Sequence, residues 1–166
     1  MQLASGEWSR DFIDGKRALE NGADLENACS VMLELVGGIE FDAVGGLTLG
    51  ADQFAHVIAV LARRKWFVVR KAVKGRGTNR RVEGADIHEG VRVLLVDDIV
   101  TTGSSIRQAY EVIRDLGAVV TGAVTLVDRG ETAGRMFQAE GIPYFAVATY
   151  KELGINPVGD DGLIHA

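Results

Sequence analysis

The sequence predicts an α/β fold built on a central, mostly parallel sheet with helices on both of its faces. Strand-like apolar runs alternate with helical periodicity, and they cover residues 41–45, 65–70, 91–97, 119–127 and 143–148. Because each run is apolar on both pleat faces, both faces of each strand would be buried, as in a parallel sheet covered by helices. Glycine or charged pairs follow these runs, where ligands bind in such sheets. These pairs are Gly45–Gly46, Arg70–Lys71, Asp97–Asp98 and Asp128–Arg129.

The segments between the strand-like runs have the spacing of helices. Residues 22–37 carry apolar side chains at helical positions, with an N-cap near Asp24 and a stop at Gly37 and Gly38. Three further helices are predicted over residues 50–64, 104–117 and 130–141, and a last turn over 150–155. Residues 1–19 are predicted to be irregular or short-stranded and the tail, 156–166, to be frayed. With 166 residues, the chain is expected to form a single domain.

Composition narrows the class of protein. Hydrophobic residues make up 47% of the chain and charged residues 25%, which is typical of a globular protein. The chain has no apolar run long enough for a membrane span, and its first residues lack the pattern of a secretory signal. The single cysteine, Cys29, forms neither a disulfide nor a metal-binding pattern. We therefore expect a cytoplasmic location and no membrane partner, and the net charge of −5 disfavours nucleic acid as a partner.

Positive charge is nevertheless concentrated in residues 63–81, which hold nine of the 18 lysines and arginines. The segment that follows the second strand-like run, residues 72–90, is rich in glycine and has no clear period. A structureless segment of that length inside a compact domain is usually functional. The pattern predicts either a mobile loop that contacts an anionic ligand or a solvated basic loop.

Residues 91–106, "VRVLLVDDIVTTGSSI", place two acids between an apolar strand and the small polar residues that open a helix. Backbone N–H groups and hydroxyls at such a helix start bind phosphate, and Gly103 would let the backbone approach it closely. Asp97 and Asp98 would repel a lone phosphate, but carboxylates accept hydrogen bonds from a neighbouring sugar diol. Ribose 5-phosphate, with a Mg²⁺ nearby to offset the acids, fits this pattern. The alternative is that Asp98 is only an N-cap and "TTGSS" a polar turn.

The same stretch resembles the binding motif for 5-phosphoribosyl 1-diphosphate (PRPP) in type I phosphoribosyltransferases. Other segments are similar to the orotate phosphoribosyltransferases of that family: "LASGEWSRDFID" (3–14), "VVRKAVKGRGTNRRVEG" (68–84), "VTLVDR" (124–129) and "VATYKELG" (147–154). The resemblance runs from about residue 3 to 155. It implies the type I phosphoribosyltransferase fold, with a reduced hood over residues 1–20 and a flexible catalytic loop over 72–90.

The resemblance also implies an activity, its partners and its site residues. The reaction would transfer the phosphoribosyl group of PRPP to orotate in pyrimidine nucleotide biosynthesis, in a homodimer with shared active sites. Mg²⁺ would be the cofactor, bound mainly through PRPP and water, with no metal ligand from the protein. The implied catalytic residues are Lys71, Lys74 and Arg76. The implied PRPP-binding residues are Arg70, Lys71, Lys74, Arg76, Asp97, Asp98, Ile99, Val100, Thr101, Thr102, Gly103, Ser104 and Ser105. The implied orotate-binding residues are Phe12, Ile13, Thr101 and Arg129.

The sequence also departs from the family pattern. Arg76 stands where the catalytic loop usually has histidine, Leu49 replaces a common lysine, and Ala4 replaces a basic residue. The helical segment that most members carry ahead of "SG" is missing. Two alternatives therefore stay open: a phosphoribosyltransferase for another base, and a PRPP-binding regulatory protein without catalysis. Arg129 argues against a purine as the base, and the basic loop argues against a purely regulatory module.

Overall fold

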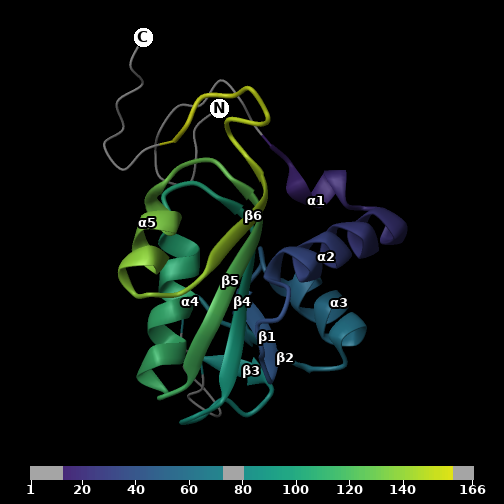
Figure 1. The fold of residues 1–166 in the computed structure, drawn as a ribbon. Helices are drawn as coiled ribbons and strands as arrows, with labels where there is room; N and C mark the ends of the chain where they lie inside the picture. The colour runs from purple at the N-terminus through teal and green to yellow at the C-terminus, as the bar shows by residue number, and fades with distance from the viewer. Residues whose placement is uncertain (1–12, 73–80, 159–166) are drawn as a thin grey trace.

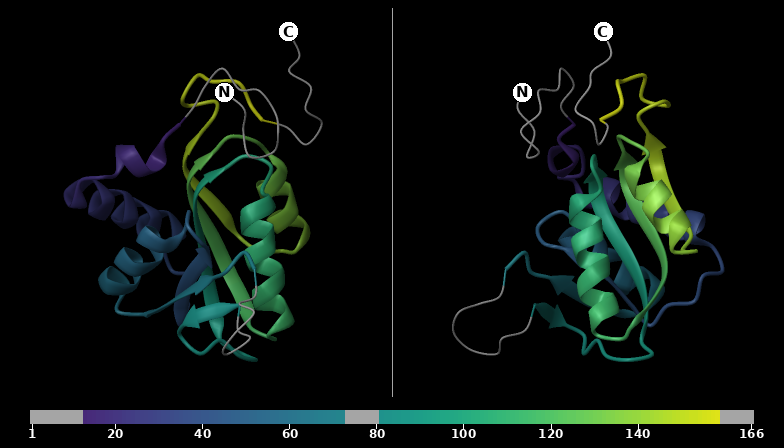
Figure 2. Two further views of the ribbon diagram at one scale, coloured as in Figure 1. Left: turned by 180° about the vertical axis from the view of Figure 1, so that it is seen from behind. Right: turned by 90° about the vertical axis from the view of Figure 1, so that its left-hand side faces the viewer.

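The computed structural model describes residues 13–72 and 81–158, and within them a six-stranded sheet lies between two pairs of helices (Figure 1). Helices α2 and α3 cover one face and α4 and α5 the other, and both views in Figure 2 show these layers. The elements in chain order are α1 (Gly15–Ala18), α2 (Gly22–Val36), β1 (Ala43–Leu47), α3 (Asp52–Ala62), β2 (Lys65–Val69), β3 (Val82–Gly84), β4 (Arg92–Val100), α4 (Ser104–Asp115), β5 (Val119–Asp128), α5 (Thr132–Ala139) and β6 (Tyr144–Thr149). The predicted α/β class is confirmed.

The strand order is β3-β2-β1-β4-β5-β6. All neighbouring pairs are parallel except β2 and β3, which pair antiparallel at one edge. From β1 the chain builds the sheet outward through β2, and it then returns to the other side of β1 with β4. The order therefore reverses between β1 and β4, which is the point where open α/β sheets bind their ligands.

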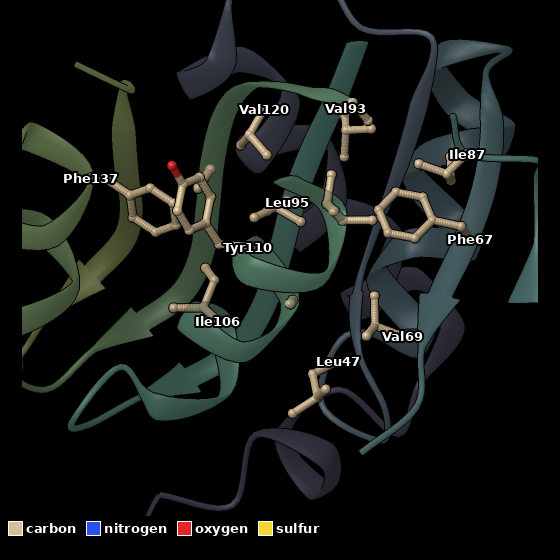
Figure 3. Close-up of a cluster of buried hydrophobic side chains, with 14 of the residues drawn as sticks. Leu47, Phe67, Val69, Ile87, Val93, Leu95, Ile106, Tyr110, Val120 and Phe137 are labelled. Carbon is tan, nitrogen blue, oxygen red and sulfur yellow. The ribbon is translucent and has the colours of Figure 1, made fainter. Parts of the chain in front are cut away.

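Two apolar layers hold the helices to the sheet. Figure 3 shows the layer under α4 and α5, where Phe67, Leu95, Ile106 and Phe137 are almost completely buried. The layer under α2 and α3 contains Met32, Phe54 and Ile58. Removing a side chain of this size from water contributes about 1.5–3 kcal/mol. The interlocked layers make the sheet a rigid support for the loops at the ends of its strands.

Cys29 belongs to the second layer and is fully buried. Burial raises the pKa of its thiol to about 12, so the group stays protonated at neutral pH.

Four local predictions were wrong. Residues 15–18 form a helical turn instead of an irregular or short-stranded segment, because Asp14 caps it by accepting a hydrogen bond from the backbone N–H of Arg17 at 3.0 Å. The strand β3 lies within the predicted loop 72–90, where backbone pairing with β2 forms it without an apolar pattern. Trp66 is half-exposed although a fully buried strand was predicted, since β2 ends the parallel part of the sheet. In the predicted frayed tail, Val158 is buried and donates its backbone N–H to the carbonyl of Arg129 at 2.7 Å.

Within the described ranges 13–72 and 81–158, none of the helices has both the length and the hydropathy that crossing a membrane requires.

Candidate active site

The turn after β4 presents backbone donors to solvent. Gly103 is the N-cap residue of α4 with φ of 76°, a left-handed conformation that favours glycine. No side chain caps this helix, so the N–H groups of Ser104 and Ser105 lack the helical partner that later residues have. Thr101 and Thr102 are half-buried beside them. This arrangement can bind an anion with several N–H and O–H donors at the positive end of a helix dipole.

Two carboxylates lie at the end of β4, which continues through them to Val100. The Asp97 side chain accepts a hydrogen bond from the backbone N–H of Asp98 at 3.0 Å. Asp98 accepts one from the N–H of Ile99 at 2.6 Å and a second from Lys16 Nζ at 3.3 Å. Asp97 is only 4% exposed. Burial, and then the neighbouring charge of Asp98, raise its pKa from 3.8 to about 7, so that near neutral pH it can hold or release a proton.

A glycine makes room for this pair. A β-carbon on Gly50 would lie 2.7 Å from Oδ1 of Asp97 and 2.7 Å from Oδ1 of Asp98, closer than such contacts occur. Gly50 belongs to the turn after β1, where the peptide bond between Thr48 and Leu49 is cis. The turn therefore packs directly against the acids at the point where the strand order reverses.

A cavity of about 410 Å³ opens at this place. Its lining comes from α1, the turn after β1, the end of β2, the end of β4 and the start of α4. The lining residues are Lys16, Leu47, Thr48, Leu49, Gly50, Lys71, Asp97, Asp98 and Ser105. A lining with both carboxylates and cations suits a ligand that carries both hydroxyls and phosphates.

A second cavity, of about 740 Å³, lies at the opposite ends of the strands, between Asp42, the basic residues 63–65 and the segment 86–91. We assign the site to the smaller cavity, because ligands of such sheets bind at the carboxyl ends of the strands.

Lys71 is held at the smaller cavity by its own backbone. Its carbonyl accepts hydrogen bonds from Arg81 Nη2 at 3.3 Å and from Gln108 Nε2 of α4 at 3.2 Å. The neighbouring Arg70 points elsewhere, since its guanidinium pairs with Glu83 of β3 at 2.9 Å. Of the two basic residues after β2, Lys71 is thus the one that lines the cavity.

Arg129 follows β5 and is 2% exposed. Its backbone N–H donates to the carbonyl of Val100 at 2.8 Å, which ties it to the end of β4. Its Nη2 donates to the carbonyl of Asn156 at 3.5 Å, so the last described segment folds over it. Asp128 next to it is also buried, and burial raises the pKa of its carboxyl. Arg129 therefore lies close to the turn of residues 101–105, but it does not line the 410 Å³ cavity.

Comparison with known proteins identifies the family. A model of the phosphoribosyl transferase domain matches residues 31–137. Orotate phosphoribosyltransferase of Streptomyces avermitilis is 42% identical over 160 residues, which cover 93% of this chain and 87% of that protein. The chain belongs to the orotate phosphoribosyltransferase family. The member from Pyrococcus furiosus is 37% identical over 153 residues, covering 91% of this chain and 84% of that protein.

Solved structures of this family have the same fold. Orotate phosphoribosyltransferase from Aeropyrum pernix superposes with a TM-score of 0.79 and 36% identity, covering 93% of this chain and 89% of that one. The Mycobacterium tuberculosis enzyme in complex with PRPP superposes with a TM-score of 0.75 and 34% identity, covering 93% and 90% of the two chains. The fold and the enzyme class predicted from the sequence are confirmed.

The residues predicted for this orotate phosphoribosyltransferase site are distributed as follows. Asp97, Asp98, Lys71 and Ser105 line one cavity. The remaining residues of the turn, together with Ile99 and Val100, adjoin it in the chain, whereas Ile13 lies half-buried just before α1. Arg70 and Arg129 make the separate contacts given above. Phe12, Lys74 and Arg76 lie outside the described residues.

Three residues that the sequence did not indicate contribute to the cavity or support it. Lys16 and Gly50 line it, and Gln108 fixes the backbone of Lys71. Gly50 ends the glycine-containing stretch "GGLTLG", which was a usable signal. Lys16 and Gln108 carry no pattern of their own, because only the fold brings them next to residues far away in the sequence.

Proposed function

We propose that this protein catalyses the transfer of the 5-phosphoribosyl group from PRPP to orotate, giving orotidine 5′-monophosphate and diphosphate for pyrimidine nucleotide biosynthesis. The observation that carries the proposal is the cavity between β1 and β4, which joins the buried Asp97 and the partly buried Asp98 to the uncapped start of a helix. Few ligands other than a phosphorylated sugar need both features at once. The family members named above have the same activity in their names.

PRPP would lie across this cavity. The backbone N–H groups and hydroxyls of residues 101–105 would bind its 5-phosphate. Asp97 and Asp98 would accept hydrogen bonds from the two ribose hydroxyls, which fixes the ring. Lys71, on the β2 side of the cavity, would contact the diphosphate. Lys74, Arg76 and Arg70 are proposed to add positive charge around the same group.

In the reaction, the bond between the anomeric carbon and the diphosphate oxygen breaks, and a bond to a ring nitrogen of orotate forms as that nitrogen loses its proton to the leaving diphosphate or to solvent. The ribose passes through a state of oxocarbenium character, so negative charge develops on the leaving diphosphate. Cations positioned at that group stabilise the charge and lower the barrier. The rigid sheet holds the sugar, and closure of the basic loop would exclude water, which would otherwise attack the same carbon.

Mg²⁺ is the proposed cofactor. Within the described parts of the chain, no group of three acidic, histidine or cysteine side chains could hold a metal ion. The carboxylates of Asp97 and Asp98 line the cavity, and a site with this donor set would accommodate an ion held mainly by the oxygens of PRPP and by water. When bound, the ion would offset charge on the diphosphate.

Orotate would bind near the ends of β4 and β5. Arg129 provides a guanidinium that is fixed by the fold, and its planar fork suits a carboxylate or a ring carbonyl. Thr101 lies one residue beyond β4, to which Arg129 is hydrogen-bonded. Phe12 and Ile13 are proposed to line the base pocket.

We also propose a homodimer in which basic loop residues act in the partner's site. Val60, Leu61 and Trp66 leave apolar surface exposed on the α3 and β2 side of the molecule, which supports a subunit contact there. Sedimentation velocity at several protein concentrations tests this, with a stable dimer as the expected result and a monomer as the contradicting one. A cytoplasmic location also stays a prediction.

The test of the function is a turnover assay with PRPP, Mg²⁺ and one base at a time: orotate, uracil, adenine and hypoxanthine. The loss of orotate absorbance and the release of diphosphate are followed together. Diphosphate release with orotate alone is the expected result. If diphosphate is released only with another base, that base and not orotate is the substrate. If PRPP binds but no mixture releases diphosphate, the protein is regulatory.

A further inference from the structure

We propose that Lys16 is a substrate-positioning residue for PRPP: its ammonium group orients Asp98 toward the ribose hydroxyls and adds a second cation to the cavity besides Lys71. This inference rests on the proposed function and assigns a role to a residue of α1. Lys16 Nζ lies 3.3 Å from Asp98 Oδ2, and both side chains line the 410 Å³ cavity.

The position of Lys16 is fixed by its neighbours in α1. Gly15 is buried, and a β-carbon there would lie 3.3 Å from Cδ1 of Ile99 and 3.8 Å from Cδ2 of Leu126. The helix therefore rests with its glycine against Ile99 of β4 and Leu126 of β5. Asp14 caps the same turn. Since Ile99 is the residue after Asp98, this contact brings the next side chain of α1 to the carboxylate.

The electrostatic surroundings explain why a cation is useful there. Asp97 and Asp98 are adjacent acids, and burial raises the pKa of Asp52 at the start of α3, an increase that His56 and then Lys16 oppose. Lys16 likewise opposes the increase in the pKa of Asp97 that burial and Asp98 cause. Among the described residues lining the cavity, only Lys16 and Lys71 carry positive charge.

The contact with Lys16 also fixes the orientation of the Asp98 carboxylate. Its Oδ1 is occupied by the N–H of Ile99, and its Oδ2 by Lys16, so both oxygens have a fixed direction. A ribose hydroxyl can donate a hydrogen bond to the remaining lone pairs of these oxygens. Because the carboxylate is already oriented, little side-chain entropy is lost when the sugar binds. Lys16 is 58% exposed, so the ion pair contributes little to folding stability, and its effect should be seen in substrate binding.

The test compares four proteins: wild type, Lys16→Met, Lys16→Arg and Arg17→Met. Methionine keeps an unbranched apolar stem while removing the charge. Arg17 is exposed on the same helical turn, so its substitution removes an equal charge from α1 beside the site. For each protein, kcat, the KM for PRPP and the KM for orotate are measured, together with the thermal unfolding midpoint.

We expect Lys16→Met to increase the KM for PRPP about five- to tenfold, as the loss of a partly exposed charged contact should. The KM for orotate should change less than twofold, Lys16→Arg should restore most of the PRPP affinity, and the unfolding midpoints should agree. Equal values of the PRPP KM in Lys16→Met and Arg17→Met would overturn the inference, because only net charge would then matter.

Calorimetric titration of PRPP with Mg²⁺ into the same four proteins separates this inference from the proposed function. If the wild type fails to turn over orotate, the proposed function fails. The Lys16 inference is then decided by the dissociation constants alone. A five- to tenfold weaker binding in Lys16→Met than in Arg17→Met supports it, and equal dissociation constants refute it.

Discussion

Asp97 is the buried acid of the site, and the substitution Asp97→Asn tests the cost of its charge in the folded protein. Its pKa rises from 3.8 to about 7 on folding, mainly through burial and then through Asp98. Between these two values the native state holds a proton that the unfolded state has lost, so stability falls as pH rises through this window. At about 1.4 kcal/mol per pH unit, the ionised carboxylate costs up to about 4 kcal/mol above pH 7.

Asparagine removes this charge and keeps an oxygen for the N–H of Asp98. The free energy of unfolding of wild type and Asp97→Asn is measured by urea denaturation from pH 4 to pH 8. The difference between them should shift in favour of Asp97→Asn by up to about 4 kcal/mol across this range, while activity falls sharply. Asp115→Asn, at an exposed position near the end of α4, should stay within about 0.5 kcal/mol of wild type. A difference for Asp97→Asn that is independent of pH would refute the reasoning.

Three further outcomes are expected. Gly50→Ala places a methyl group 2.7 Å from both carboxylates, so PRPP binding by calorimetry should weaken at least about tenfold, whereas Gly22→Ala, with open space around it, should bind normally. Arg129→Lys loses the planar fork, so steady-state kinetics should show a larger increase in the KM for orotate than for PRPP. A hydrogen bond from Arg92 lowers the pKa of Asp42 to about 2. The decrease in the urea unfolding midpoint that Arg92→Gln causes should therefore be largest above pH 4 and should shrink as pH falls toward 2. Normal PRPP binding by Gly50→Ala would contradict the first expectation. Equal changes in the two KM values of Arg129→Lys would contradict the second, and a midpoint difference for Arg92→Gln that does not vary with pH would contradict the third.

The layered sheet could be predicted from the sequence because burial on both faces leaves a plain pattern. Runs such as residues 119–127 are apolar on both pleat faces, with Thr121 and Thr125 as the polar exceptions, and β5 matches this run to within one residue. The pattern failed where polar residues take part in the sheet. The apolar run of β4 stops at Val96, yet the strand continues to Val100, where the Thr125 hydroxyl donates to the carbonyls of Asp97 and Asp98 at 3.2 Å and 3.0 Å.

The site could be predicted best in the part that is continuous in sequence, and Lys71 is the predicted residue from another segment that lines the same cavity. Residues 97–105 lie together in one motif, so the kind of ligand they bind could be predicted from the sequence alone. Lys16 and Asp98 are 82 residues apart, and Gly50 acts through the side chain that it lacks. Such contacts depend on the packing of α1 and of the turn after β1, which local propensity does not encode. Arg70 and Lys71 were both predicted to bind PRPP, and the pairing of Arg70 with Glu83 of β3 shows that only Lys71 of the two lines the cavity.

The most direct test of the central claim is a crystal structure of the protein with PRPP, Mg²⁺ and a non-reactive orotate analogue. We predict the 5-phosphate at the start of α4 on residues 101–105, the ribose hydroxyls on Asp97 and Asp98, and the base beside Arg129. A phosphate bound elsewhere, for example in the 740 Å³ cavity at the opposite ends of the strands, would contradict the account.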